Sequence, residues 1–302
     1  LRNAVTLLSS DEADAEPSIA KRRLALDHLA DTAVQVVPYP DRLGVVLTGR
    51  QPLGSSTDWF LPPTDDGEDA ASATQRDRVR LDDHTRHVLE STRSAVEKLP
   101  LDVSAYVFER AAELHDLGKA DDRFQAMLRR SDRTDAWLLA GASSAFLAKS
   151  DAVPLTRAQR REARERAGLP PGFRHEMLSV QIAERSTDLP ENEHERALML
   201  HLVAAHHGYA RPFAPVVQDD ELPTVEVGDV ELTHDERTRL IPPHRIDSGI
   251  AERFWQLTRR YGWWGLPYLE AVLRLADQQA SAAEDAGTYE TRDARRRAEV
   301  AT

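Results

Sequence analysis

The 302-residue chain contains no cysteine. Disulfide bonds and thiolate metal ligands are therefore excluded, and any metal site must use histidine, aspartate or glutamate. No apolar stretch is long enough to span a bilayer, and the amino terminus lacks the basic and then apolar layout of a signal peptide. The sequence thus indicates a soluble protein, which we expect in the cytoplasm, a location compatible with the absence of cysteine.

Positive charge is scarce, because 39 lysines and arginines face 51 aspartates and glutamates and give a net charge of −12. This balance argues against a general attraction to nucleic acid or to an anionic membrane surface. A polyanionic substrate would need a locally basic path or bound cations. The chain also lacks a phosphate-binding glycine-lysine loop, so any strand separation must come from elsewhere.

The chain divides into three regions by sequence pattern. Residues 1–62 hold a helical stretch and two valine-rich segments around a Pro-Asp-Arg-Leu-Gly turn, which predicts a β-hairpin. Residues 63–80 are acidic and proline-led, as linkers are. Residues 81–302 repeat apolar residues every three or four positions, which predicts helices, while residues 224–233 alternate about a Gly-Asp pair and predict an inserted hairpin. We expect an all-α domain preceded by a small α/β segment.

Several histidines fall on the apolar faces or at the ends of the predicted helices. His84 lies three residues after Leu81 and four before Val88, on the inward stripe of its helix. His115 continues the stripe that contains Phe108, and Asp116 follows it directly. Further inward or helix-terminal positions hold His175, His206, His207 and Asp277.

Each of these residues has an ordinary explanation when taken alone, because a single inward histidine is more often a hydrogen-bonded core residue than a ligand. Five histidines and two aspartates in one domain would leave many buried polar groups unsatisfied. A metal centre removes this cost, and imidazoles with a shared carboxylate suit transition metals better than magnesium. His87, close to His84 on the same helix, is a competing ligand candidate.

The order His84, His115-Asp116, Asp277 resembles the H…HD…D signature of the HD metal-dependent phosphohydrolase superfamily. The segments "HDLGK", "RHEMLS", "HHGYARP" and "LADQQAS" resemble the nuclease domain of the CRISPR-associated type I interference nuclease-helicase. This resemblance covers about residues 81–285. Most members of that family carry the nuclease at the amino end, whereas some 80 residues precede it here and the first residue is Leu1. We therefore expect an architecture with the helicase first, its tail in residues 1–62, and the HD domain last.

The resemblance implies two divalent transition-metal ions, Fe, Mn, Co or Ni rather than Mg. It assigns the first ion to His84, His115, Asp116 and Asp277. It assigns the second ion to Asp116, His175, His206 and His207, with Asp116 bridging. The resemblance implies that Asp116 and Lys119 are the catalytic residues. Lys119 would contact a phosphate oxygen of the substrate; the alternative is that Lys119 is a solvated lysine at a helix end. Ser281 would orient Asp277. The alternative is that Ser281 contributes only to helix packing.

Two weaker features concern nucleic acid. Residues 157–174 carry six arginines against two glutamates and could guide a DNA strand toward His175, although such a run is usually a solvated helix face. The candidate DNA-binding residues are Arg157, Arg160, Arg161, Arg164 and Arg174. The segment "YGWWG" at 261–265 could stack bases, although aromatics that introduce an apolar helix are more often core.

The function implied by the resemblance is two-metal cleavage of single-stranded DNA, as an endonuclease or exonuclease in CRISPR antiviral interference. The implied partners are a helicase domain or subunit and an RNA-guided type I surveillance complex. An HD-type nucleotide phosphohydrolase is one alternative, but it needs only the first ligand set and leaves His175, His206 and His207 unexplained. A catalytically silent adaptor is the other alternative, and the complete ligand set disfavours it.

Overall fold

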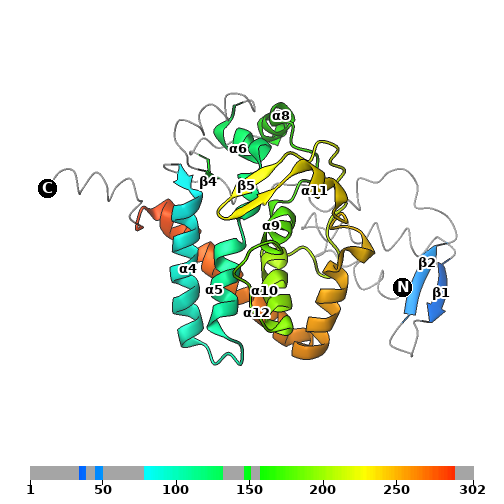
Figure 1. Cartoon of the computed structure of the whole chain (residues 1–302). Helices are drawn as coiled ribbons and strands as arrows, with labels where there is room; N and C mark the ends of the chain where they lie inside the picture. Colours follow the sequence, from blue (N-terminus) through cyan, green and yellow to red (C-terminus); the bar gives the residue numbers. More distant parts are fainter. Residues whose placement is uncertain (1–33, 39–44, 50–77, 132–145, 151–156, 290–302) are drawn as a thin grey trace, which may run out of the picture. The chain divides into compact units, whose positions relative to one another are not determined.

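The computed structural model describes residues 34–38, 45–49, 78–131, 146–150 and 157–289 (Figure 1). For residues 34–38, 45–49, 157, 158 and 160 it describes the backbone alone. The chain forms two compact units, Leu1–Thr64 and Asp65–Thr302. In the first unit, β1 (Val34–Pro38) pairs antiparallel with β2 (Val45–Gly49), so the predicted hairpin is confirmed. The helix expected before it and most of the expected linker lie outside the described residues.

The second unit is mostly helical, which confirms the predicted fold class. Its helices are α4 (Leu81–Lys98), α5 (Ala105–Leu114), η4 (Leu117–Ala120), α6 (Asp122–Arg129), α8 (Arg157–Ala167), α9 (His175–Ala183), α10 (Glu193–Ala205), α11 (His234–Arg239), η5 (Ile246–Ser248) and α12 (Ile250–Ala286). Its short strands are β3 (Val79–Arg80), paired with β4 (Leu147–Lys149), and β5 (Val225–Val227), paired with β6 (Val230–Leu232). None of the helices in the described part of the chain is long and apolar enough to cross a membrane.

Four helices pack side by side around the main core, since α4 packs against α5 and α12, and α10 packs against α5 and α12 (Figure 1). Their apolar stripes meet in a cluster that includes Val88, Phe108, Leu202 and Leu273, all at most 1% exposed. Burying each such side chain stabilises the fold by roughly 1.5–3 kcal/mol. This packing fixes the relative positions of the helices that carry the predicted ligands.

The hairpin predicted within the helical region is confirmed. Val225 lies opposite Leu232, and Gly228 takes a left-handed φ of 62° in the two-residue turn between the strands. Apolar and polar residues alternate because the hairpin has one buried and one exposed face: Val225 and Leu232 are buried, whereas Glu226 and Glu231 are exposed. The buried face packs with Phe124 and other residues in a second apolar cluster.

The helix α12 is broken at Gly262, whose φ of 77° and ψ of 173° are not helical. The break places Trp263 and Trp264 at the surface, 67% and 88% exposed. The core interpretation of this segment is therefore wrong for these two residues, and base stacking stays a prediction. After the break, the helix resumes through Pro267 and carries Asp277 into the bundle.

Candidate metal centre

The predicted ligands lie on or beside six helices of the second unit. His84 is in the first turn of α4, His115 and Asp116 join α5 to η4, and His175 is the first residue of α9. The remaining ligands are His206 and His207, which follow the last turn of α10, and Asp277 on α12. The structure therefore brings together residues that are up to 193 positions apart in the sequence, from 84 to 277.

Asp116 occupies the middle of this group, and its side chain is only 2% exposed. Its Oδ2 lies 3.5 Å from Nε2 of His84 and 3.5 Å from Nε2 of His115. Its Oδ1 lies 3.0 Å from Nε2 of His175 and 3.7 Å from Nε2 of His206. One carboxylate oxygen thus faces each set of histidines, which is the arrangement that a bridging ligand requires.

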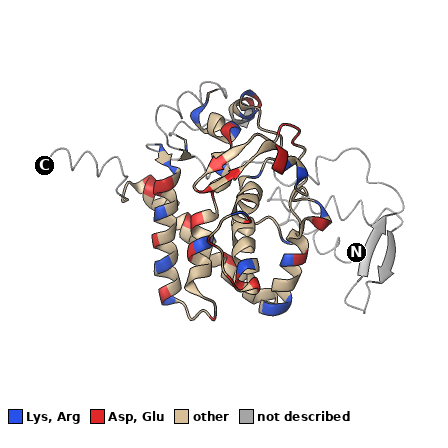
Figure 2. Ribbon diagram, viewed as in Figure 1, with Lys and Arg blue, Asp and Glu red and all other residues tan. Residues whose placement is uncertain are grey.

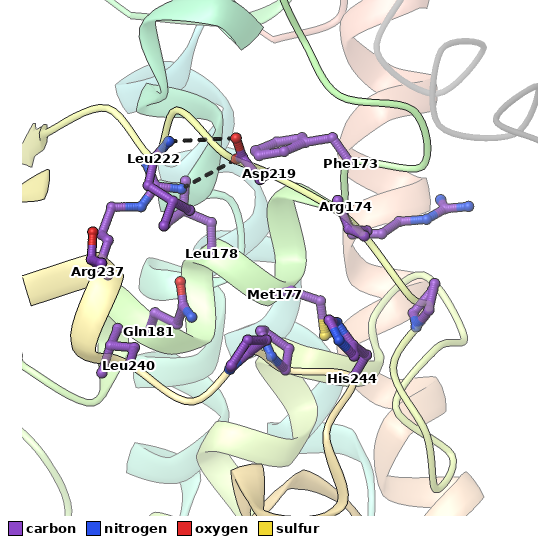
Figure 3. Close-up of a pocket in the computed structure, with 15 residues that line it drawn as sticks. Phe173, Arg174, Met177, Leu178, Gln181, Asp219, Leu222, Arg237, Leu240 and His244 are labelled. Atoms are coloured by element: carbon purple, nitrogen blue, oxygen red, sulfur yellow. Dashed lines mark hydrogen bonds and ion pairs between the residues drawn. The ribbon is translucent and has the colours of Figure 1, made fainter.

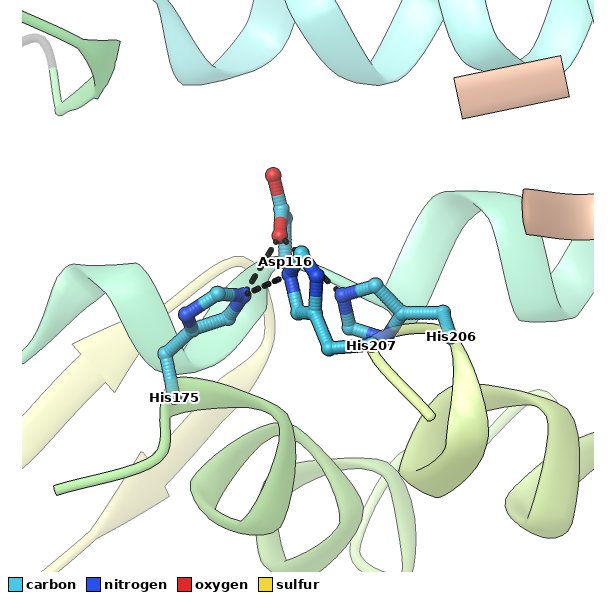
Figure 4. A group of neighbouring side chains, drawn as sticks. All are labelled: Asp116, His175, His206 and His207. Carbon is cyan, nitrogen blue, oxygen red and sulfur yellow. Dashed lines mark hydrogen bonds and ion pairs between the residues drawn. The ribbon is translucent and has the colours of Figure 1, made fainter. Parts of the chain in front are cut away.

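The second ligand set forms a tight group. One donor atom from each of Asp116, His175, His206 and His207 lies within 4.8 Å of all the others. The Nε2 atoms of His175 and His207 are 3.3 Å apart, and the three imidazole rings converge on the carboxylate in Figure 4. Three ring nitrogens and one carboxylate oxygen at this spacing could hold a divalent ion.

The first ligand set gathers around His84. Donor atoms of His84, His115 and Asp116 also lie within 4.8 Å of one another. Asp277 Oδ1 lies 3.2 Å from Nε2 of His84, and the hydroxyl of Ser281, one turn further along α12, lies 3.5 Å from the same carboxylate oxygen. Ser281 therefore lies beside Asp277, and its role in orienting that ligand stays a prediction.

Two buried histidines have the hydrogen-bonding state of metal ligands. His115 donates from Nδ1 to the carbonyl of Ala112, and His206 donates from Nδ1 to the carbonyl of Val203, both at 2.7 Å. In a neutral ring, this leaves the lone pair on Nε2, and neither Nε2 has a hydrogen-bond partner among the described residues. Buried, unsatisfied nitrogens whose other ring atom is fixed by a carbonyl suit a transition metal.

The charge states agree with this fit. Burial lowers the pKa of His115 to about 4 despite the nearby Asp116. Burial, with His206 and His175 nearby, also holds the pKa of His207 well below its usual range. Burial alone would raise the pKa of Asp116, but His115, Lys119 and two further histidines outweigh it and hold that pKa well below its ordinary value. At neutral pH, the Asp116 carboxylate anion thus lies beside the neutral imidazoles of His115 and His207, as metal ligation requires.

His84 differs from the other ligands. Burial lowers its pKa, but hydrogen bonds with Asp277 and Glu284 outweigh burial and raise the pKa to about 9. The ring therefore holds a second proton between Nε2 and Asp277 when no cation is present. A metal ion that both groups bind would take the place of this proton.

Lys119 is buried, at 4% exposure, and its Nζ lies 2.7 Å from Oδ2 of Asp116. The alternative of a solvated lysine at a helix end is therefore wrong. The ammonium group offsets part of the negative charge that Asp116 brings into the interior. It also places a fixed positive charge at the edge of the candidate site.

Gly118 allows η4, which follows Asp116, to lie close to the start of α9, which carries His175. A Cβ at this position would lie 2.0 Å from the carbonyl oxygen of His175 and 2.8 Å from the backbone nitrogen of Ser179. The backbone of Gly118 instead donates a hydrogen bond of 2.8 Å to the hydroxyl of Ser179. Gly118 does not serve to end a helix, because α5 already ends at Leu114. The glycine is required by close contact between η4 and α9.

Sequence reasoning missed two charged residues beside the ligands. Glu284 accepts hydrogen bonds from His84 and from His87, and Lys149 lies 3.0 Å from its second oxygen. His87, the competing ligand candidate, thus faces Glu284, and its ring stacks on Tyr289. The spacing of seven residues from Asp277, which puts Glu284 on the same helix face, was a usable signal. No such signal existed for Lys149, because it lies on the strand β4 and no helix periodicity relates it to a ligand.

The arginine candidates lie in different surroundings. Arg161 is exposed and lies 3.4 Å from Glu165, a pairing that cancels part of the local positive charge. Arg164 and Arg174 are each 6% exposed, and the guanidinium of Arg174 lies 4.0 Å from the ring centre of Tyr209. Figure 2 shows red and blue segments alternating along α4, so basic residues are also mixed with acidic ones there. The side chains of Arg157 and Arg160 lie outside the description, and DNA contact stays a prediction.

A separate pocket of about 150 Å³ lies between α9, α11 and the preceding loop (Figure 3). Its walls are mostly apolar and include Phe173, Met177, Leu222 and Leu240. Of the residues near the candidate site, Arg174 reaches it, but none of the predicted metal ligands lines it. The buried ligand groups, rather than this pocket, therefore hold the chemistry that the sequence indicates.

Comparison with known proteins gives one match. The model of the family "Cas3, HD domain" matches residues 69–259. Neither the curated proteins nor the solved structures include a match. The matched family points to a metal-dependent nuclease role in CRISPR, and the buried groups of histidine and aspartate agree with metal binding. Because the match spans well over half of the chain and includes all of the predicted ligands except Asp277, the chain belongs to the Cas3 HD domain family.

Proposed function

We propose that this chain cleaves single-stranded DNA by phosphodiester hydrolysis that depends on two divalent metal ions. The observation that carries the proposal is the placement of Asp116, whose Oδ2 faces His84 and His115 while its Oδ1 faces His175 and His206. One buried carboxylate between two sets of imidazoles supports a shared ligand and two ions rather than one.

The two ions would be held by residues on or beside these six helices. The first set is His84, His115, Asp116 and Asp277, and the second is Asp116, His175, His206 and His207. A bound pair of such ions supplies a hydroxide-like nucleophile at neutral pH and stabilises the attacking and leaving oxygens of an in-line displacement. His115 and His207 hold their neutral form for this role, because loss of contact with water keeps the pKa of both rings low.

Residues beside the ligands would act on the DNA strand and on the ligand geometry. Lys119, whose Nζ lies 2.7 Å from Asp116, would stabilise charge on a nonbridging phosphate oxygen of the strand. Ser281 orients Asp277 through its hydroxyl. We propose a helicase domain or subunit and an RNA-guided surveillance complex as partners, since the family acts in CRISPR and DNA must be presented as a single strand.

We also propose the domain division of residues 1–62 as the tail of a preceding helicase-type domain, 63–80 as a linker and 81–302 as the HD domain. The compact units Leu1–Thr64 and Asp65–Thr302 are compatible with a boundary in this region.

A nucleotide phosphohydrolase is the main alternative function. It would need only the first ligand set, whereas His175, His206 and His207 lie beside Asp116 in a second complete set. The same completeness disfavours a silent adaptor. Incubation with circular single-stranded DNA and, separately, with nucleotides distinguishes the three, because only the nuclease linearises the circle and only the phosphohydrolase releases phosphate.

Protein purified without chelator is expected to contain two transition-metal ions per chain. Treatment with EDTA should abolish cleavage of circular single-stranded DNA, and Mn²⁺ or Co²⁺ should restore it, because the ligand groups fill two sites. Metal analysis and a cleavage assay measure both effects. A single tightly bound ion, with full activity after both His206 and His207 are changed to alanine, would contradict the two-ion proposal.

Replacement of Lys119 by methionine is expected to keep both ions and to lower the cleavage rate about 100-fold, the loss typical of one group that stabilises transition-state charge. The ions should remain because methionine fills the buried space and removes only the cation near Asp116. The control is Lys98→Met, since Lys98 is exposed and bonds only Ser94 among the described residues. Equal rates for both variants at full metal content would rule out a role for Lys119 in cleavage.

A further inference from the structure

The face that α12 presents to α4 carries two carboxylates. Asp277 and Glu284 are seven residues apart, or two helical turns, so they share one face of α12. His84 and His87 are three residues apart and share one face of α4. The carboxylates of α12 meet these histidines across the interface between the two helices.

The ring of His84 is bracketed by these two carboxylates. Its Nδ1 lies 3.0 Å from Oε1 and 3.1 Å from Oε2 of Glu284. Its Nε2 lies 3.2 Å from Asp277 and points to the centre of the first ligand set. A carboxylate can only accept at Nδ1, so Glu284 fixes the ring proton there and, when a metal is bound, leaves the Nε2 lone pair for it.

Glu284 is itself held by two buried groups. His87, which is 0% exposed, donates from Nδ1 to Oε1 at 2.8 Å. Lys149, which is 2% exposed, places its Nζ 3.0 Å from Oε2. The ammonium of Lys149 compensates the charge of the carboxylate in the interior, and β4 is thereby tied to the metal centre.

We infer that Glu284 is a positioning residue of the metal centre, which sets the orientation and the proton position of His84 for the first ion, with His87 and Lys149 holding Glu284 in place. The inference rests on the metal-dependent function proposed above and adds a residue outside the ligand sets. Its action is through His84, since Glu284 contacts Nδ1 and not the side of the ring that faces the other ligands.

The chain offers a matched control for this inference. Glu270, also on α12, accepts a hydrogen bond of 2.8 Å from Nε2 of His201 on α10, and both residues are buried. His201 belongs to neither ligand group. Loss of the Glu270 carboxylate therefore breaks a buried glutamate–histidine pair of the same kind without touching a proposed ligand.

The test compares Glu284→Gln, Glu284→Asp and Glu270→Gln in the full chain. Chelator-treated protein is titrated with Mn²⁺ in the absence of DNA, and circular dichroism and thermal unfolding report the fold. Glu284→Gln is expected to weaken the first site about 10- to 100-fold, the loss typical of a residue that orients a metal-bound histidine. Glu284→Asp, which keeps the charge, should lie between this variant and the unmodified protein. Glu270→Gln should lose thermal stability but bind both ions normally.

Equal Mn²⁺ affinities for Glu284→Gln and the unmodified protein would overturn the inference, as would an equal weakening by Glu270→Gln. If Glu284→Gln does not fold, Glu284→Asp decides the matter, because normal affinity at the first site would then overturn it. The outcome is separable from that of the proposed function. Weakened Mn²⁺ binding in a protein that cuts no single-stranded DNA contradicts only the nuclease, whereas normal binding by the variants of an active nuclease contradicts only the role of Glu284.

Discussion

Replacement of Asp116 by asparagine is expected to weaken binding of both metal ions together and to reduce cleavage of single-stranded DNA by about 1,000-fold or more, since the metals contribute several kcal/mol to such reactions. Asparagine keeps the size of the side chain but removes the negative charge that offsets two adjacent cations. Asp116 is the one residue shared by both proposed ligand groups, with an oxygen toward each. Metal analysis and a cleavage assay on the folded variant measure the effect.

His175→Ala is the matched comparison for this prediction. Nε2 of His175 approaches Oδ1 of Asp116 and belongs to the second group alone, so its loss should spare the first ion while still preventing two-metal cleavage. Circular dichroism should show a preserved fold for both variants, because the core comes mainly from apolar side chains of the four packed helices. If Asp116→Asn retains two ions and cuts normally, Asp116 is not a bridge.

Much of the fold of the described residues could be predicted from hydrophobic spacing. The inserted hairpin followed from alternation around Gly228, and the run of apolar residues in α10, residues 198–205, is buried. The course of α12 could not be predicted in the same way. Its apolar pattern continues past residue 262, whereas the left-handed backbone of Gly262 interrupts the helix and turns Trp263 and Trp264 toward solvent. Periodicity reports which face of a helix is apolar, but it does not report where the helix changes direction.

The inward or helix-end position of each ligand was predictable from spacing, whereas their grouping around Asp116 was implied only by the family resemblance. The surroundings of His84 were only partly predictable, since its contact with Asp277 follows from the family pattern but its contact with Glu284 does not. Lys149 reaches Glu284 from a strand far away in sequence, and only the tertiary packing of β4 reveals this. Ion pairs between different helices and strands depend on tertiary packing, which leaves no periodic pattern in the sequence.

Gly118→Ala is expected to lower the free energy of unfolding by about 3 kcal/mol or more, at or above the usual cost of overpacking, because the added Cβ meets backbone rather than a flexible side chain. The new atom would lie 2.0 Å from the carbonyl oxygen of His175. To relieve this contact, η4 must move away from the start of α9. Asp116 immediately precedes η4, so the movement should also separate Asp116 from His175 and weaken the second ion.

Ser179→Ala separates this steric effect from the hydrogen bond at the same contact. The variant removes only the hydroxyl that accepts from the backbone of Gly118, so its expected cost is about 1 kcal/mol with both ions retained. Urea unfolding and metal analysis on the two variants give the comparison. A Gly118→Ala protein as stable as Ser179→Ala, with two ions bound normally, would mean that η4 and α9 can separate without disturbing the ligands. The expected difference between the two variants would instead mean that the absence of a side chain at Gly118 is required for Asp116 to approach His175.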